Sequence, residues 1–323
     1  MSSRRPVAKR PRPVILIIIM LLLLCVGLCA TQFHADIPIE EMKARYTNEN
    51  SRFITVQGQE IHYRLEGRTD ARANTLVLIH GTASSLHTWE PWVRHLRSDF
   101  RILRYDLPGF GLTGPRPDGD YSLSNQTATL AALMDALNIR RASLAGNSLG
   151  GHIAWRFALD YPQRVRRLIL IDPSGIPGDD SGGSPLIFGL ARTPGVNLFL
   201  RYFTPRALIE ANLKQVYYND DLITDELIDR YFDMTLRAGN RQAFIDRAHL
   251  SREERYNELS TLKMPVLLMW GRHDEWIPID TARKFQDLIP DCELIAYDHA
   301  GHVPMEEIPL ETANDARAFL LQQ

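Results

Sequence analysis

The 323-residue sequence predicts an α/β protein with a mostly parallel central sheet, helices on both faces of that sheet and an inserted helical cap, preceded by a transmembrane helix. Two observations carry this prediction. Short continuous apolar runs, which are typical of strands buried on both faces, alternate with segments of helical periodicity. In addition, an uncharged apolar run follows a basic N-terminus, a pattern typical of a membrane-inserted segment.

The N-terminal pattern comes first along the chain. Residues 1–13 carry five basic residues and no acid, and residues 14–30 carry no charge. A spanning helix needs about 20 apolar residues, with a lower limit near 17. Because basic residues stay in the cytoplasm, we expect residues 14–30 to form a single-pass signal anchor, with the body of the protein on the periplasmic or extracytoplasmic side. The alternative is a cleaved signal peptide and a secreted protein.

The charge and cysteine content of the remaining chain exclude some classes of partner. Beyond residue 13 there are 32 basic and 39 acidic residues, so no basic surface excess is expected and a nucleic-acid partner is unexpected. Cys292 alone lies outside residues 14–30. A disulfide within the body is therefore excluded, and no cysteine spacing typical of a metal site exists.

The body of the protein is expected at residues 52–323, after a polar tether at residues 31–51. Its first element is a hairpin, because two alternating segments flank Gln57-Gly58-Gln59. Strands and helices then alternate. The expected strands are residues 76–79, 101–105, 142–145, 168–171, 266–270 and 294–297, and the expected helices are residues 124–137, 148–159 and 311–321.

One long segment interrupts this alternation. Residues 175–185 are rich in Gly, Pro and Ser, and helical patterns follow at residues 206–217 and 224–236. We therefore expect residues 176–260 to form a helical cap, with the core built from residues 52–175 and 261–323. The aromatic residues of this cap line a substrate pocket or form the cap's own core: Phe188, Phe199, Tyr202, Phe203, Tyr217 and Tyr218.

The strongest local motif is Gly146-Asn147-Ser148-Leu149-Gly150, which matches the nucleophile elbow G-x-S-x-G. In such an elbow the serine sits on a sharp strand-to-helix turn, and side chains two positions away on either side would collide. The turn also places the serine at a helix N-terminus, which favours developing negative charge. An apolar strand is expected before Ser148 and a helix after it, so we predict that Ser148 is a nucleophile.

A serine hydroxyl needs a base, and the base needs an acid that orients it. The strand expected at residues 266–270 ends in a loop that carries Asp274, and the strand at residues 294–297 ends in a loop that carries His302. Both loops follow carboxyl ends of strands, where open α/β sheets place their sites. We therefore predict a triad of Ser148, His302 and Asp274, with Asp172 as the alternative acid.

These motifs together make residues 52–321 resemble the α/β-hydrolase superfamily. Within it the chain looks like the branch of lidded serine esterases, cofactor-free haloperoxidases and C–C bond hydrolases. Dehalogenases and epoxide hydrolases of this fold carry Asp at the elbow, and Ser148 argues against both activities. The motifs that carry the resemblance are His80-Gly81, residues 106–111, residues 146–151, residues 271–274 and residues 299–302.

The resemblance also implies the rest of the site. Its oxyanion hole maps onto the backbone N–H groups of Thr82 and Leu149, and no metal or organic cofactor is expected. Trp276 follows the acid and is a candidate for the substrate pocket. Every predicted catalytic residue lies outside the cap, so we expect the cap to set substrate choice.

The expected function is a serine hydrolase that cleaves an acyl or ester bond of a small or medium apolar substrate through an acyl-enzyme. The alternative is a C–C bond hydrolase of ring-cleavage diketones, although Val303 follows His302 where those enzymes usually carry Trp. A hypothesis of another class is a non-catalytic binding protein on the same scaffold. The substrate, the bond cleaved and the oligomeric state stay open at this point.

Overall fold

The computed structural model describes residues 32–70, 73–177, 186–250 and 254–322, together with Ile17, Ile18, Met20 and Gly27. The basic N-terminus expected at residues 1–13 and the transmembrane helix expected at residues 14–30 lie outside these residues, apart from the four named. Within the described part of the chain, no helix combines the length and the apolar character that crossing a membrane requires.

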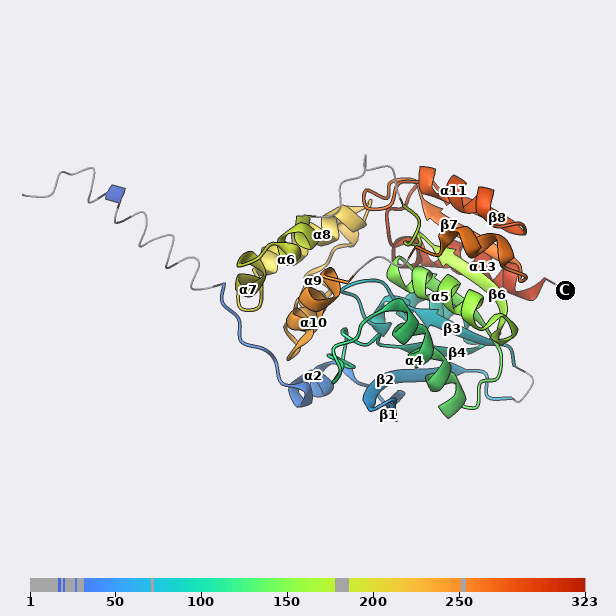
Figure 1. Ribbon diagram of the computed structural model, residues 1–323, viewed down its shortest axis with the longest axis horizontal. Coiled ribbons are helices and arrows are strands. Elements are labelled where there is room, and N and C mark those ends of the chain that lie inside the picture. The colour runs from blue at the N-terminus through green and yellow to red at the C-terminus, as the bar shows by residue number, and fades with distance from the viewer. Residues whose placement is uncertain are drawn as a thin grey trace, which may run out of the picture.

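A mostly parallel eight-stranded sheet forms the centre of the described body, in the order β1-β2-β4-β3-β5-β6-β7-β8 (Figure 1). The pairs β1–β2 and β2–β4 are antiparallel, and the other neighbours pair in parallel. The predicted sheet type is therefore confirmed. The strands are β1 (Ser51–Val56), β2 (Gln59–Gly67), β3 (Thr75–Ile79), β4 (Arg101–Tyr105), β5 (Ala142–Asn147), β6 (Val165–Ile171), β7 (Val266–Gly271) and β8 (Cys292–Tyr297).

Both faces of the sheet are covered, as β3 illustrates. Val77 and Ile79 belong to one hydrophobic cluster, whereas Leu76 and Leu78 belong to another on the opposite face. Successive side chains of a strand alternate between faces, so a strand buried on both must be apolar throughout. The covering helices are α4 (Leu123–Ala136), α5 (Leu149–Asp160) and α11 (Asp280–Leu288) on one face, and α3 (Glu90–Leu96), α12 (Pro304–Glu307) and α13 (Pro309–Leu321) on the other.

The chain between β6 and β7 forms helices in its described part. Figure 1 shows α6–α10 grouped together at one end of the sheet, within the segment expected as a cap at residues 176–260. The start of α9 explains one boundary, because the Thr224 side chain accepts from the Leu227 N–H and two acids follow in the first turn. The helices are α6 (Leu186–Arg192), α7 (Val196–Leu200), α8 (Arg206–Val216), α9 (Asp225–Leu236) and α10 (Asn240–Ala248).

The N-terminal segment differs from the tether expected at residues 31–51. It contains the helix α2 (Ile39–Tyr46), whose Met42 is fully buried. Phe33 and Ile37 form isolated bridges with residues of the segment between β6 and β7. The helical pattern of this segment is weak in the sequence, because its few apolar residues are spaced among many charged ones. These apolar residues nevertheless pack the segment against the body and against the α6–α10 region.

Candidate active site

Ser148 lies at the sharp turn between β5 and α5, with φ 54° and ψ −117°. A non-glycine residue with positive φ is uncommon and signals strain that the surrounding structure maintains. The two flanking glycines are required by close backbone approach. A Cβ on Gly146 would lie 2.2 Å from the Gly150 carbonyl oxygen, and a Cβ on Gly150 would lie 2.0 Å from the Ile79 carbonyl oxygen. The elbow therefore has no room for larger residues.

His302 pairs with Asp274 beside this turn. The His302 Nδ1 lies 2.6 Å from an Asp274 carboxylate oxygen, and both side chains are buried. The other Asp274 oxygen accepts from the Trp276 and Ile277 N–H groups at 2.8 and 2.9 Å. Because Asp274 takes the proton-bearing Nδ1, the Nε2 of His302 is left to accept a proton. That Nε2 is buried without a hydrogen-bond partner among the described residues, and His302 lines the same cavity as Ser148.

The loop that carries His302 is held by residues to which the sequence assigned no role. Asn147 Nδ2 donates to the His302 carbonyl at 2.9 Å, and the His302 N–H donates to the Val216 carbonyl at 2.7 Å. The Gly301 N–H donates to Glu307 at 2.7 Å. Val216 ends α8, so the expected cap helps to hold the base. No sequence signal marks Val216, because it acts through its backbone carbonyl.

Asp172, the alternative acid, follows β6 next to the triad and does not bond His302. It is fully buried, and one oxygen accepts from the Gly271 N–H at 3.0 Å. Burial and then the charge of Asp274 raise the pKa of Asp172 well above its ordinary value. In the described part of the chain, Asp172, Asp274 and His302 are also the one cluster with metal-ligand spacing. We assign no metal to it, because His302 and Asp274 bond each other and one Asp172 oxygen accepts from the Gly271 N–H.

The two N–H groups proposed for the oxyanion hole flank the elbow. Leu149 is the first residue of α5, so its N–H has no acceptor within the helix. Thr82 follows Gly81, where an added Cβ would lie 3.1 Å from Asn147 Oδ1 and 3.2 Å from Ser148 Cβ. Thr82 lines the cavity together with Ser148. Within the described residues, neither N–H donates to an acceptor, so both are available to a bound oxyanion.

His80 and Asp106 act as a scaffold beneath these loops. The His80 Nδ1 donates to the Gly81 carbonyl and its Nε2 accepts from the Leu107 N–H, at 2.8 and 2.9 Å. Burial lowers the pKa of His80, so this ring is neutral. Asp106 accepts from His62, at 2.8 Å, and from two backbone N–H groups. Burial alone would raise the pKa of Asp106, but His62 holds it below the ordinary value.

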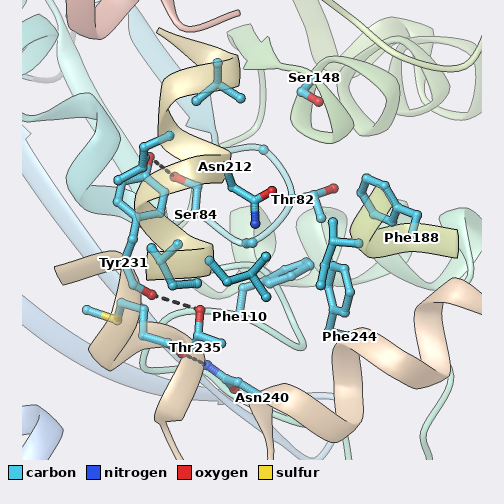
Figure 2. A pocket seen from close by; sticks show the side chains of 18 of the residues that line it. Thr82, Ser84, Phe110, Ser148, Phe188, Asn212, Tyr231, Thr235, Asn240 and Phe244 are labelled. Atoms are coloured by element: carbon cyan, nitrogen blue, oxygen red, sulfur yellow. Dashed lines mark hydrogen bonds between the residues drawn. The ribbon is translucent and has the colours of Figure 1, made fainter. Parts of the chain in front are cut away.

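The cavity in front of Ser148 is mainly apolar. Figure 2 shows Ser148 at one end, Phe188 and Phe244 on one wall and Tyr231 on the other. Trp276 also lines it, with its ring centroid 5.4 Å from that of His302. Of the six aromatic residues singled out above, Phe188 alone belongs to the described lining. The other apolar lining residues are Phe110, Ile187, Leu200, Leu208, Ile209, Leu213, Val216, Met234, Ile245 and Val303.

Arg241 is the one lysine or arginine in the described wall of this cavity. Its guanidinium donates to an Asp36 carboxylate oxygen, at 3.2 Å from Nε and 2.5 Å from Nη2, and Nη2 also donates to the His34 carbonyl at 2.8 Å. Nη1 is buried and has no partner among the described residues. The N-terminal segment therefore balances the charge of an arginine that the cavity contacts.

Comparison with known proteins identifies the fold family of the chain. The family model of the alpha/beta hydrolase fold matches residues 74–309. A 2-hydroxy-6-oxononadienedioate/2-hydroxy-6-oxononatrienedioate hydrolase of Paraburkholderia phymatum is 31% identical, over 75% of this chain and 84% of that protein. Among solved structures, the enol-lactonase from Burkholderia xenovorans superposes with a TM-score of 0.72 at 25% identity, covering 84% of this chain and 100% of its own. A membrane phospholipase A superposes with a TM-score of 0.71 at 27% identity, covering 95% of this chain and 97% of its own.

Proposed function

Because the chain belongs to the alpha/beta hydrolase fold family, we propose that it is a serine hydrolase that cleaves the ester bond of a small or medium apolar acyl substrate. The observation that carries this proposal is that Ser148, on its elbow turn, and His302, paired with Asp274, line one apolar cavity. A mainly apolar lining with few polar groups is typical of small-molecule sites, where the apolar walls supply burial and the polar groups supply orientation. A neutral acyl chain matches such a lining, since it leaves no charge unpaired.

The proposed reaction uses the residues in the following roles. His302 Nε2 takes the hydroxyl proton of Ser148 while the serine oxygen attacks the acyl carbon, and Asp274 holds the imidazole through Nδ1. The N–H groups of Thr82 and Leu149 stabilise the oxyanion. His302 then returns the proton to the leaving alcohol, and a water molecule repeats the sequence on the acyl-enzyme.

Two of the solved structures support an ester substrate. An enol-lactonase acts on a cyclic ester, and a phospholipase A acts on an ester of a lipid. The phospholipase also matches a larger share of this chain than the lactonase does. Both likenesses agree with a substrate that presents an acyl carbon and an apolar chain.

A second candidate is the C–C bond hydrolase expected as the alternative. Several curated relatives at 26–31% identity are named as hydrolases of 2-hydroxy-6-oxo dienoates. Such substrates carry a carboxylate, and Arg241 offers a buried Nη1 without a partner among the described residues. These names favour the C–C reaction, whereas the pairing of Arg241 with Asp36 favours a neutral substrate.

A substrate panel tests the choice. We expect purified enzyme to hydrolyse neutral p-nitrophenyl esters of increasing acyl length, and to act more slowly on a 2-hydroxy-6-oxo-dienoate. Arg241→Gln is expected to leave KM for the neutral esters nearly unchanged. A preference for the dienoate, together with a dienoate KM that Arg241→Gln raises tenfold or more, would replace the ester proposal by C–C hydrolysis.

The location of the protein is a separate proposal. The basic residues 1–13 and the apolar run at 14–30 support a single-pass anchor with the body on the extracytoplasmic side, and secretion after cleavage is the alternative. Because Phe33 and Ile37 pack on the body, a truncation that tests the anchor removes residues 1–31 and no more. The full chain is expected in the membrane fraction and the truncated chain outside it; a full chain that carbonate extracts would refute the anchor.

A further inference from the structure

Asp172 occupies an unusual place beneath the triad. It follows the last residue of β6 with φ 43°, and it is fully buried. Its N–H donates to the Met269 carbonyl at 3.0 Å, which ties this turn to β7. A non-glycine residue held at positive φ is kept there by its surroundings and is frequent at functional sites.

The carboxyl group of Asp172 lies beside Asp274 and His302, the acid and the base of the proposed triad. Its Oδ1 accepts from the Gly271 N–H at 3.0 Å, whereas its Oδ2 accepts from no donor among the described residues. One ligand atom each from Asp172, Asp274 and His302 lie within 4.8 Å of one another. The second carboxyl oxygen of Asp172 is therefore left for contact with the Asp274 carboxylate.

The charges around this pair do not favour two carboxylates. Asp274 already accepts from His302 and from two backbone N–H groups, whereas Asp172 accepts from the Gly271 N–H alone among the described residues. The other ionisable groups that bear on Asp172 are Glu307 of α12 and Tyr297 of β8, and no lysine or arginine of the described chain forms an ion pair with either acid. Two buried like charges at this distance cannot both persist without a cation.

We propose that Asp172 retains its proton at neutral pH and donates a hydrogen bond to the Asp274 carboxylate, so that it is a positioning residue for the Asp274–His302 pair. This bond adds one more fixed donor to the carboxylate that orients His302, besides the Trp276 and Ile277 N–H groups. The raised pKa of Asp172 agrees with this assignment. The inference rests on the proposed function only in that it takes His302 as the base.

Infrared spectroscopy tests the proton directly. At neutral pH the full chain is expected to show the carbonyl stretch of a protonated carboxylic acid, which shifts in heavy water and disappears in Asp172→Asn. Glu307 is the matched control, because burial also raises the pKa of its carboxyl. A band that persists in Asp172→Asn and disappears in Glu307→Gln would overturn the proposal, and so would the absence of any such band in the wild type.

Paired substitutions test the positioning role. Asp172→Leu keeps a similar volume without a donor, and we expect kcat to fall roughly tenfold to a hundredfold with KM nearly unchanged, the range for losing a hydrogen bond to a charged group. The amide N–H of Asp172→Asn replaces the hydroxyl donor and should recover most of that loss. Equal damage in both variants would mean that the charge of Asp172 is needed, and the proposal would be wrong.

Unfolding measurements supply a readout that does not depend on folding of the leucine variant. When the pKa of a carboxyl is higher in the folded state than in the unfolded state, the protein becomes less stable as pH rises above the ordinary pKa, which is 3.8 for Asp. Asparagine does not titrate. The denaturation midpoint of Asp172→Asn is therefore expected to rise relative to the wild type between about pH 4 and pH 7. A difference between the two midpoints that does not shift in favour of the variant over this interval would show that Asp172 is ionised.

Labelling by a fluorophosphonate separates this inference from the proposed function. If Ser148 reacts but the infrared band is absent, the assignment of Asp172 fails and the serine mechanism stands. If the band is present but Ser148 neither reacts nor turns over an ester, the proposed function fails and the shared proton stands.

Discussion

The carboxyl edge of the sheet and the layer formed by α6–α10 are built in different ways. Every residue of β5, which leads to Ser148, is buried, and buried side chains hold the loops at this edge by hydrogen bonds: Asn147 donates to the His302 carbonyl, and Asp106 accepts from the Leu86 N–H. By contrast, α7 has no fully buried residue and α8 buries only Leu213 and Val216. The reactive groups are thus fixed by directional hydrogen bonds. The cavity wall formed by α6–α10 is held by apolar contacts, which tolerate more motion and more substitution.

The two regions are nevertheless joined at two places. The Val216 carbonyl accepts from the His302 N–H, and Glu307 accepts from the Tyr218 and Asn219 N–H groups. On the outer side, the N-terminal segment ties itself to α10 through Asp36 and Arg241. The layer of α6–α10 is therefore not an independent lid, since the loop that carries His302 is held partly by hydrogen bonds to this layer.

The largest expected effect is that of Ser148→Ala. Removing the nucleophile should lower kcat roughly a millionfold and abolish fluorophosphonate labelling, while the unfolding midpoint changes little. Triad members act as a unit, so adding His302→Ala should cause little further loss. Ester turnover at the wild-type rate in Ser148→Ala would end the serine mechanism and bring forward the binding-protein hypothesis.

The second effect concerns the acid. Asp274→Asn is expected to lower kcat roughly ten-thousandfold, because an amide no longer holds His302 in the tautomer that carries its proton on Nδ1 and leaves Nε2 free to accept one. Asp172→Asn is the matched control, as the same change on the neighbouring strand. If Asp172→Asn were the more damaging of the two in steady-state kinetics, Asp172 would be the partner of His302.

The third effect concerns stability at the sheet edge. Asp106→Ala leaves His62 and two backbone N–H groups without their acceptor, and it should lower the free energy of unfolding by about 3–5 kcal/mol. The pKa of Asp106 is below its ordinary value of 3.8, so its contribution is present above that pH and lost as pH falls below it. Urea denaturation at pH 7 and pH 3 measures both. A deficit that stays constant on acidification would contradict the charged role.

The smallest effect concerns the apolar layer. Asp36→Ala leaves the Arg241 charge at the cavity wall without its carboxylate partner, and we expect KM for an apolar ester to rise about fivefold, equivalent to about 1 kcal/mol, with kcat nearly unchanged. Glu40→Ala, in the same segment, removes an exposed acid that pairs only with Lys43 and serves as the control. Equal kinetics in both variants would show that the segment does not influence the cavity.

Sequence reasoning succeeded where one local feature had one physical cause. Continuous apolar runs identified the central strands to within a few residues, because a strand covered on both faces carries mostly apolar side chains. The glycines at 146 and 150 indicated the elbow, because backbone approach excludes a Cβ there. Short amphipathic helices such as α2 and α11 were not predicted. In α11, for example, only Thr281, Ala282 and Phe285 are buried, and charged residues lie among them.

What the sequence by itself determined about this protein is the order of the sheet-edge loops and the residue types at their tips: serine, acid and histidine at the carboxyl ends of three strands. It predicted Asp274 as the acid but left Asp172 as the alternative, because both follow strands that are neighbours in the sheet. The tertiary structure decided this by distance, placing Asp274 at 2.6 Å from His302 and burying Asp172 behind it. Likewise the hydrogen bond from the His302 N–H to the Val216 carbonyl and the Asp36–Arg241 ion pair form only on folding. Each joins segments that are distant in the sequence, and no sequence pattern predicts either contact.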